Sequence, residues 1–166
     1  MARPICRSTR LSGMRSLELK VPPPAVALVT AVLMWLVSQA APVLDFNIPA
    51  RSLIAAILAA AGVIVAITGV ATFARAKTTV NPTTPQSSST LVSWGIYTVT
   101  RNPMYLGLLL VLTGWAIFLS NVLPFLLLPA YIFYMNRFQI APEERALTSL
   151  FGSQYAAYRS RVRRWI

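Results

Sequence analysis

The stretch GIYTVTRNPMYLG, residues 95–107, places polar and turn-forming residues at the start of a long apolar segment. Pro103 suits the first position of a helix, and Asn102 suits the cap position before it. Arg101 would then lie beside the positive end of the helix dipole, where backbone N–H groups and a guanidinium favour a carboxylate or phosphate. The spacing therefore predicts an anion-binding site at a helix N-terminus.

Two tyrosines and a glycine accompany this predicted site. Tyr97 and Tyr105 flank the arginine, and Gly107 would let a ligand or a neighbouring helix approach closely. A simpler interpretation gives the same pattern: Arg101 anchors a helix to lipid phosphate, and the tyrosines belong to an interfacial aromatic belt. Both interpretations place residues 95–107 at a membrane boundary.

A pair of acids forms the second candidate element. Glu143 and Glu144 are two of only four acidic residues in the chain, and they follow the last long apolar segment. They could bind a cation or hydroxyl groups, or they could complement a helix dipole and pair with nearby arginines. Together with Arg101 they offer opposite charges at one membrane face. Such a pair suits a zwitterionic ligand, such as the amino-acid end of S-adenosylmethionine.

Long uncharged segments must position these residues. The chain is 56% hydrophobic and 11% charged, with a mean hydropathy of +0.62. Because about 20 apolar residues cross a bilayer core, these segments predict membrane helices. Ser120, Asn121 and Pro124 divide the longest uncharged run into two. We therefore expect an all-α polytopic membrane protein with about four transmembrane helices, near residues 24–41, 53–74, 103–119 and 122–136.

The net charge of +11 is placed asymmetrically. Fourteen of the 15 basic residues fall before the first span, between the second and third, or after the fourth, and only Arg51 falls on the other side. The positive-inside rule then places both termini in the cytoplasm, and we expect contact with anionic lipid rather than nucleic acid. The compact chain favours a bacterial protein of the inner membrane.

The N-terminal residues 1–20 form an expected disordered, basic tail, in which Met14 is an alternative start. The basic start and the sequence SQAAP at 38–42 imitate a cleavable signal peptide, but the apolar segment is long for one. Cys6 is the only cysteine, so neither an intramolecular disulfide nor a thiolate metal cluster is expected, and no metal site is predicted. Residues 21–166 are expected to form one domain.

The C-terminal segment 137–166 changes character. Pro142 suits the first turn of a helix, and Gly152 suits its end. Tyr155, Tyr158 and Val162 follow at spacings of three and four, on one helical face. The surrounding arginines and Trp165 predict an amphipathic helix at the membrane surface. The loop 74–95 is a candidate lid or binding loop.

These motifs resemble those of the isoprenylcysteine carboxyl methyltransferase and phospholipid methyltransferase superfamily of integral membrane enzymes. The resemblance covers residues 78–166, through TTVNP, LVSWGIYTVTRNPMYLG and APEERALTSLFGSQYAAYRSRVRRWI. It implies a methyltransferase that uses S-adenosylmethionine. By position it assigns cofactor binding to Tyr97, Arg101, Asn102, Pro103, Tyr105, Gly107, Glu143, Glu144, Tyr155 and Tyr158. Arg101 would bind the cofactor carboxylate, and Glu144 or Glu143 its ammonium or ribose, so Arg101 and Glu144 are the expected catalytic residues.

The sequence departs from this family at one informative point. Many eukaryotic members have histidine where this chain has Asn102, and the chain contains no histidine at all, which excludes an imidazole base. The acceptor stays open among an isoprenylcysteine-like carboxylate, a lipid amine and a thiol, as does the oligomeric state. Two other functions also stay open: a non-enzymatic accessory or transport protein, and an NADPH-dependent relative of the sterol reductases.

Overall fold

The computed structural model describes residues 18–76 and 90–166, and this part of the chain forms helices and no strand. The expected all-α class is confirmed. The predictions for residues 1–17, and for the middle of the 74–95 loop at 77–89, lie outside the described residues. The elements in chain order are α2 (Pro23–Ala40), η1 (Pro42–Leu44), α3 (Arg51–Arg75), η3 (Gly95–Thr98), α4 (Pro103–Leu119), α5 (Val122–Tyr134), η4 (Met135–Ile140) and α6 (Ala141–Arg161).

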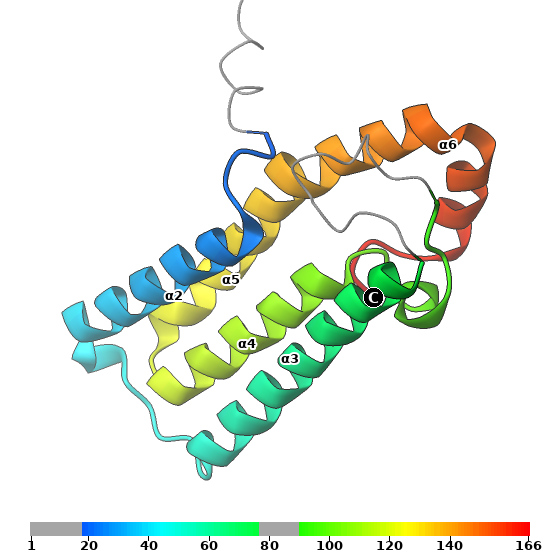
Figure 1. Cartoon of the computed structure of the whole chain (residues 1–166). Helices are drawn as coiled ribbons and strands as arrows, with labels where there is room; N and C mark the ends of the chain where they lie inside the picture. Colours follow the sequence, from blue (N-terminus) through cyan, green and yellow to red (C-terminus); the bar gives the residue numbers. More distant parts are fainter. Residues whose placement is uncertain (1–17, 77–89) are drawn as a thin grey trace, which may run out of the picture.

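Helices α2 to α5 form a bundle of two antiparallel pairs, with α2 beside α5 and α3 beside α4 (Figure 1). The main apolar core lies among α2, α4, α5 and η4, and its fully buried members include Met34, Leu112, Ala116 and Met135. The candidate site lies at the end of the bundle where α4 begins and α3 ends.

Helices α3 and α4 approach closely because glycines face each other. A Cβ at Gly62 would lie 2.5 Å from the Gly107 carbonyl oxygen, and one at Gly69 would lie 3.0 Å from Pro103 Cγ. Small residues allow such backbone contact between membrane helices. We expected either a ligand or a neighbouring helix to approach Gly107, and in the structure a neighbouring helix, α3, lies against it.

Two helices, α2 with 18 residues and α3 with 25, are long and apolar enough to cross a membrane. This is fewer than the four expected, because α4 has 17 residues and α5 has only 13. Large apolar side chains of α3 face outward, with Leu53 61% and Ile64 64% exposed. A soluble protein would bury most of such a helix, so the exposed surface fits contact with lipid.

The expected break between the fourth span and a new helix at Pro142 is absent. Instead, α5 continues through the π-helix η4 into α6. Proline has no N–H, so Pro142 cannot bond to the carbonyl of Phe138 four residues earlier. That carbonyl accepts from Leu19 N at 3.1 Å, and Gln139 Nε2 donates to the Val21 carbonyl at 2.7 Å. The N-terminal lead-in thus stabilises the irregular turn.

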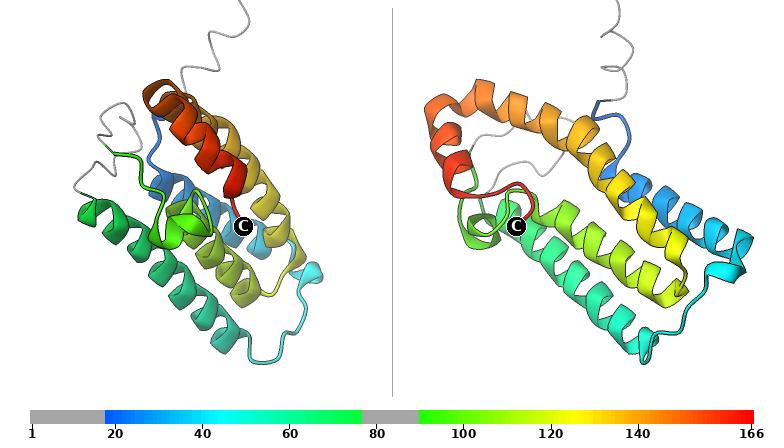
Figure 2. Two further views of the ribbon diagram at one scale, coloured as in Figure 1. Left: turned by 90° about the vertical axis from the view of Figure 1, so that its right-hand side faces the viewer. Right: turned by 180° about the vertical axis from the view of Figure 1, so that it is seen from behind.

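The expected helix end at Gly152 is present as a kink within α6. Gly152 has φ 50° and ψ −119°, a conformation that favours glycine. Beyond it, the last turns of α6 fold back toward the bundle and carry the C-terminus to the start of α4 (Figure 2). The kink therefore brings a distant segment to the candidate anion site.

Candidate functional site

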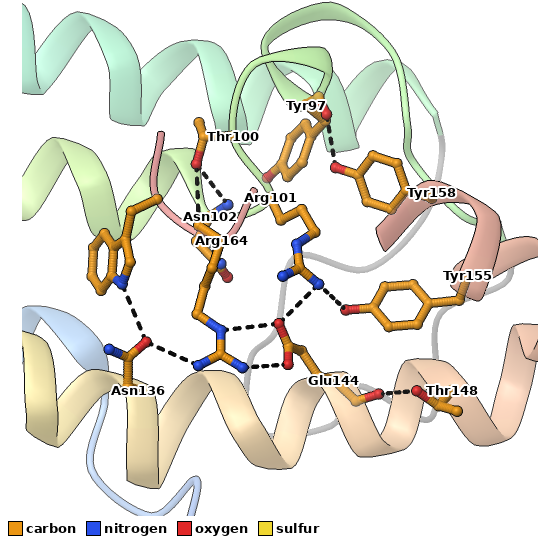
Figure 3. Close-up of polar contacts among 11 residues, drawn as sticks. Tyr97, Thr100, Arg101, Asn102, Asn136, Glu144, Thr148, Tyr155, Tyr158 and Arg164 are labelled. Atoms are coloured by element: carbon orange, nitrogen blue, oxygen red, sulfur yellow. Dashed lines mark hydrogen bonds and ion pairs between the residues drawn. The ribbon is translucent and has the colours of Figure 1, made fainter. Parts of the chain in front are cut away.

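Four segments meet at one end of the bundle: η3, the start of α4, the part of α6 before Gly152, and the residues from Gly152 to the C-terminus (Figure 3). Glu144 lies on α6 and is 8% exposed. Its Oε1 lies 3.0 Å from Arg101 NH1. Arg164 donates to both carboxylate oxygens, from Nε to Oε1 at 3.1 Å and from NH2 to Oε2 at 2.6 Å. One buried acid thus pairs with two arginines, and the cluster keeps a net positive charge.

This arrangement changes the expected roles of the two charged groups. Arg101 and Glu144 are brought together, as the sequence predicted, but they contact each other directly. The sequence also allowed the acids to pair with nearby arginines, and Glu144 does so in the structure. The anion next to the helix N-terminus is the carboxylate of the protein itself.

Tyrosines from η3 and from the part of α6 beyond Gly152 lie beside this ion pair. Arg101 NH1 donates to Tyr155 Oη at 3.4 Å, and Tyr158 Oη donates to the Tyr97 carbonyl at 2.7 Å. Tyr155 and Tyr158 are buried on one face of α6 against Tyr97, which confirms their predicted common face, whereas Val162 joins the same cluster from the extended residue that follows the helix. Burial raises the pKa of the Tyr97, Tyr155 and Tyr158 phenols, so all three stay neutral at physiological pH.

Glu143 has a different partner from its neighbour. Its Oε1 accepts a short hydrogen bond from Tyr105 Oη on α4. Burial is the main cause that raises the pKa of Glu143 to about 8; the Tyr105 hydrogen bond lowers the pKa, and the charge of Glu144 raises it further. The two acids therefore differ in their partners: a tyrosine hydroxyl for Glu143 and two guanidinium groups for Glu144.

Sequence reasoning missed Arg164 and Asn136. Asn136 Oδ1, on η4, accepts from Arg164 NH1 at 3.3 Å and from Trp165 Nε1 at 3.1 Å. Trp165 packs against the main core, so it is not the surface anchor that its position among arginines predicted. The RVRRWI ending carried charge and aromatic signals, but nothing local distinguished Arg164 from its exposed neighbours.

Backbone contacts fix the residues that follow α6 across the start of α4. Arg101 N donates to the Arg163 carbonyl at 3.1 Å, and Asn102 Nδ2 donates to the Arg164 carbonyl at 2.8 Å. Asn102 occupies the N-cap position of α4, but its side chain makes no cap hydrogen bond. The predicted cap position is therefore correct, but the predicted capping hydrogen bond is absent. The Asn102 side-chain amide donates instead to a carbonyl near the C-terminus.

Apart from Tyr105, which bonds to Glu143 from the main core, the predicted residues separate into two groups. Pro103 begins α4, as expected, but both it and Gly107 pack against α3. The other group lines a cavity of about 60 Å³, together with Leu91, Val92 and Leu147: Tyr97, Arg101, Asn102, Glu143, Glu144, Tyr155 and Tyr158. The cavity brings together residues from four segments that lie up to 67 positions apart, counted from Leu91 to Tyr158.

Among the described residues, two buried polar atoms from residues that line this cavity have no hydrogen-bond partner, Tyr97 Oη and Arg101 Nε, as does Tyr131 Oη outside the cavity. Buried donors are normally satisfied, so unsatisfied ones point to a ligand or water. Free donors, carboxylates and tyrosine rings match a ligand that carries a carboxylate, hydroxyl groups and a cationic centre. The described residues contain no cluster of three or more metal-ligating side chains.

Comparisons with known proteins agree with the motif. A family model described as phospholipid methyltransferase matches residues 50–154, which is more than half of the chain. An uncharacterized protein of Haemophilus influenzae is 48% identical over 63 residues, which cover 38% of this chain and 100% of that relative. No solved structure matches. The chain therefore belongs to the phospholipid methyltransferase family of membrane methyltransferases, as the motif resemblance implied.

Proposed function

We propose that this chain is an S-adenosylmethionine-dependent methyltransferase whose cofactor binds in the cavity at the start of α4. One observation carries the proposal: Tyr97 and Arg101, which line a cavity with other family motif residues, each keep a buried polar atom without a partner in the described part of the chain. The bound cofactor would supply an electrophilic methyl group on a sulfonium. The chain itself supplies binding, orientation and a site closed to water.

The charged residues match the two ends of the cofactor's amino-acid group. Arg101 would bind the carboxylate, and Glu144 the ammonium or a ribose hydroxyl. Because these two side chains now contact each other, binding would exchange their ion pair for contacts with the ligand. Tyr155 and Tyr158 offer aromatic faces for the adenine or the sulfonium, and a desolvated cation over such a face gains up to about 2 kcal/mol.

The size of the cavity requires a movement. A volume of about 60 Å³ holds a few waters and is smaller than a nucleoside. Glu144 also lines a more open depression of about 320 Å³, with Arg145, Thr148 and Arg159. We infer that the segment beyond Gly152 swings on that residue, because it carries both tyrosines of one cavity wall.

We further propose that α4 and α5 lie in the membrane beside α2 and α3. Helix α4, with 17 residues, is about 26 Å long, close to the thickness of a bilayer core. Arg75 ends α3 and Arg101 precedes α4 at the site end, whereas Arg51 begins α3 at the other end. The positive-inside rule then places the site and both termini in the cytoplasm, in a bacterial inner membrane.

The acceptor would be a lipophilic or small molecule that reaches the site from the bilayer or the cytoplasm. A carboxylate, an amine and a thiol are all candidates, and nucleic acid is not. Membrane lipids are the expected partners of the exposed apolar faces of α2 and α3.

Isothermal titration of the detergent-purified protein with S-adenosylhomocysteine tests this proposal, and NADPH is the control ligand. We expect saturable binding of S-adenosylhomocysteine at one site and none of NADPH. Binding of NADPH alone would favour the reductase-like relative. A protein that binds neither ligand would favour the accessory or transport role.

A further inference from the structure

Glu143 and Glu144 are neighbours in sequence but lie in opposite surroundings. Glu144 binds the guanidinium groups of Arg101 and Arg164. Within the described residues no arginine or lysine pairs with Glu143, whose carboxylate accepts only from the Tyr105 hydroxyl. Two neighbouring carboxylates in such different surroundings are typical of sites that divide binding and proton transfer.

Glu143 also occupies the boundary between the cavity and the bundle. It lines the cavity together with Tyr97 and Arg101. Its partner Tyr105 is 4% exposed and belongs to the apolar core, together with Tyr131 and Met135. A molecule that enters from the bundle side would therefore meet Glu143 before it meets the arginines around Glu144.

The groups that face Glu143 account for its titration. They are Tyr105 on α4, Tyr97 on η3 and Glu144 on its own helix, while Arg101 lines the same cavity. Burial raises the pKa of the carboxyl from 4.5 to about 8, so about a tenth of it is ionised at pH 7 and about half at pH 8. An acid that titrates near the working pH is suited to proton transfer, and this chain has no histidine for that purpose.

We propose that Glu143 is the catalytic proton acceptor for a methyl acceptor that arrives protonated, and that Tyr105 is its positioning residue. This inference rests on the proposed function. The proton passes from the heteroatom of the acceptor to the Glu143 carboxylate. The freed electron pair forms the bond to the methyl carbon, and the methyl–sulfur bond breaks with its pair kept on sulfur. Glu144, held by two arginines, stays a binding residue.

Infrared titration of the protein in detergent tests the proposal without any turnover. The band of a protonated carboxyl should disappear with a midpoint near pH 8, and Glu143→Gln should remove it. Glu18→Gln is the matched control, because Glu18 bridges Arg137 and Arg145 outside the cavity, and it should leave the band unchanged. Absence of a band that depends on Glu143 would overturn the proposal.

Tyr105→Phe gives a second variant with a signed expectation. The hydrogen bond from Tyr105 stabilises the charged carboxylate, so its loss should move the infrared midpoint to higher pH. A merely structural tyrosine would not move this midpoint. An unchanged midpoint in folded Tyr105→Phe would overturn its positioning role.

Binding and transfer separate this proposal from the proposed function. Glu143→Gln should bind S-adenosylhomocysteine within ~3-fold of wild type. Methyl transfer to dodecylamine or dodecanethiol should fall by ~100-fold or more, whereas transfer to dodecanoate, which needs no base, should change far less. Loss of S-adenosylhomocysteine binding in a folded Glu143→Gln protein would make Glu143 a cofactor ligand and overturn the proposal. Absence of S-adenosylhomocysteine binding by the wild type would overturn the proposed function and this inference with it, whereas a wild type that binds and a Glu143→Gln protein that transfers methyl groups at the wild-type rate would overturn this inference alone.

Discussion

In the described part of the chain, both ends of the helical bundle bury polar side chains, but the polar atoms of Asn121 at one end are all paired, whereas two buried polar atoms at the other end are not. At the α4–α5 turn, Asn121 is fully buried. Its Nδ2 donates to the Ala41 carbonyl at 2.8 Å and to Asp45 Oδ1 at 2.7 Å. Its Oδ1 accepts from Leu123 N at 3.0 Å. This cluster ties the 41–50 loop to the start of α5.

At the site end, by contrast, Tyr97 Oη and Arg101 Nε have no partner among residues 18–76 and 90–166, and both residues line a cavity. Most buried polar groups in native proteins are paired, so the contrast distinguishes a cluster that only holds a turn from one that awaits a further partner. Because both clusters lie in one small chain, the same substitutions can be compared at both ends.

Replacing the acid at the centre of the site cluster should have the largest effect. Glu144→Gln removes the carboxylate that binds Arg101 and Arg164. We propose that the same carboxylate binds the cofactor. A charge-assisted hydrogen bond contributes roughly 1.5–3 kcal/mol. The dissociation constant of S-adenosylhomocysteine should therefore rise by ~10- to 150-fold, measured by calorimetry. Glu18→Gln, which also removes an acid between two arginines, should leave it unchanged.

Asn121→Ala should show the reverse pattern. It removes three hydrogen bonds, two donated and one accepted, and so should lower the free energy of unfolding by ~1–3 kcal/mol. The melting temperature in detergent should fall by several degrees, while the affinity of the folded protein for S-adenosylhomocysteine stays at the wild-type value. A weaker affinity with an unchanged melting curve would erase the distinction between the two ends.

A smaller effect is expected for Arg164→Gln. Glu144 keeps Arg101 as a partner in this variant. The residues after α6 keep the backbone hydrogen bond from Arg101 N to the Arg163 carbonyl. The loss of one guanidinium that is partly exposed should change the dissociation constant by ~2- to 10-fold. A change as large as that of Glu144→Gln would make Arg164 a direct ligand rather than a supporting residue.

Local signals in the sequence predicted the features that one segment decides alone. Proline begins α4 at Pro103, and glycine breaks α6 at Gly152, because each restricts or frees its own backbone angles. The common face of Tyr155 and Tyr158 followed from helical spacing. Signals of this kind act within a few residues.

Features that depend on distant partners were missed. The chain passes Pro142 without a break because Leu19 N bonds to the carbonyl that this proline leaves free. Asn102 gives its amide to the Arg164 carbonyl, 62 positions away, instead of capping its own helix. The pairing of Arg101 with Glu144 was considered only as a general alternative, since charge alone does not decide between a ligand and a protein partner.

The most direct test of the account is one substitution made at both ends of the bundle. Arg101→Gln and Arg51→Gln each remove a guanidinium, one buried in the site and one exposed at the far end of α3. Calorimetric titration with S-adenosylhomocysteine should show a ~10- to 150-fold weaker affinity for Arg101→Gln, partial recovery in Arg101→Lys, and no change for Arg51→Gln. Wild-type affinity in folded Arg101→Gln would contradict the assignment of this cavity to the cofactor.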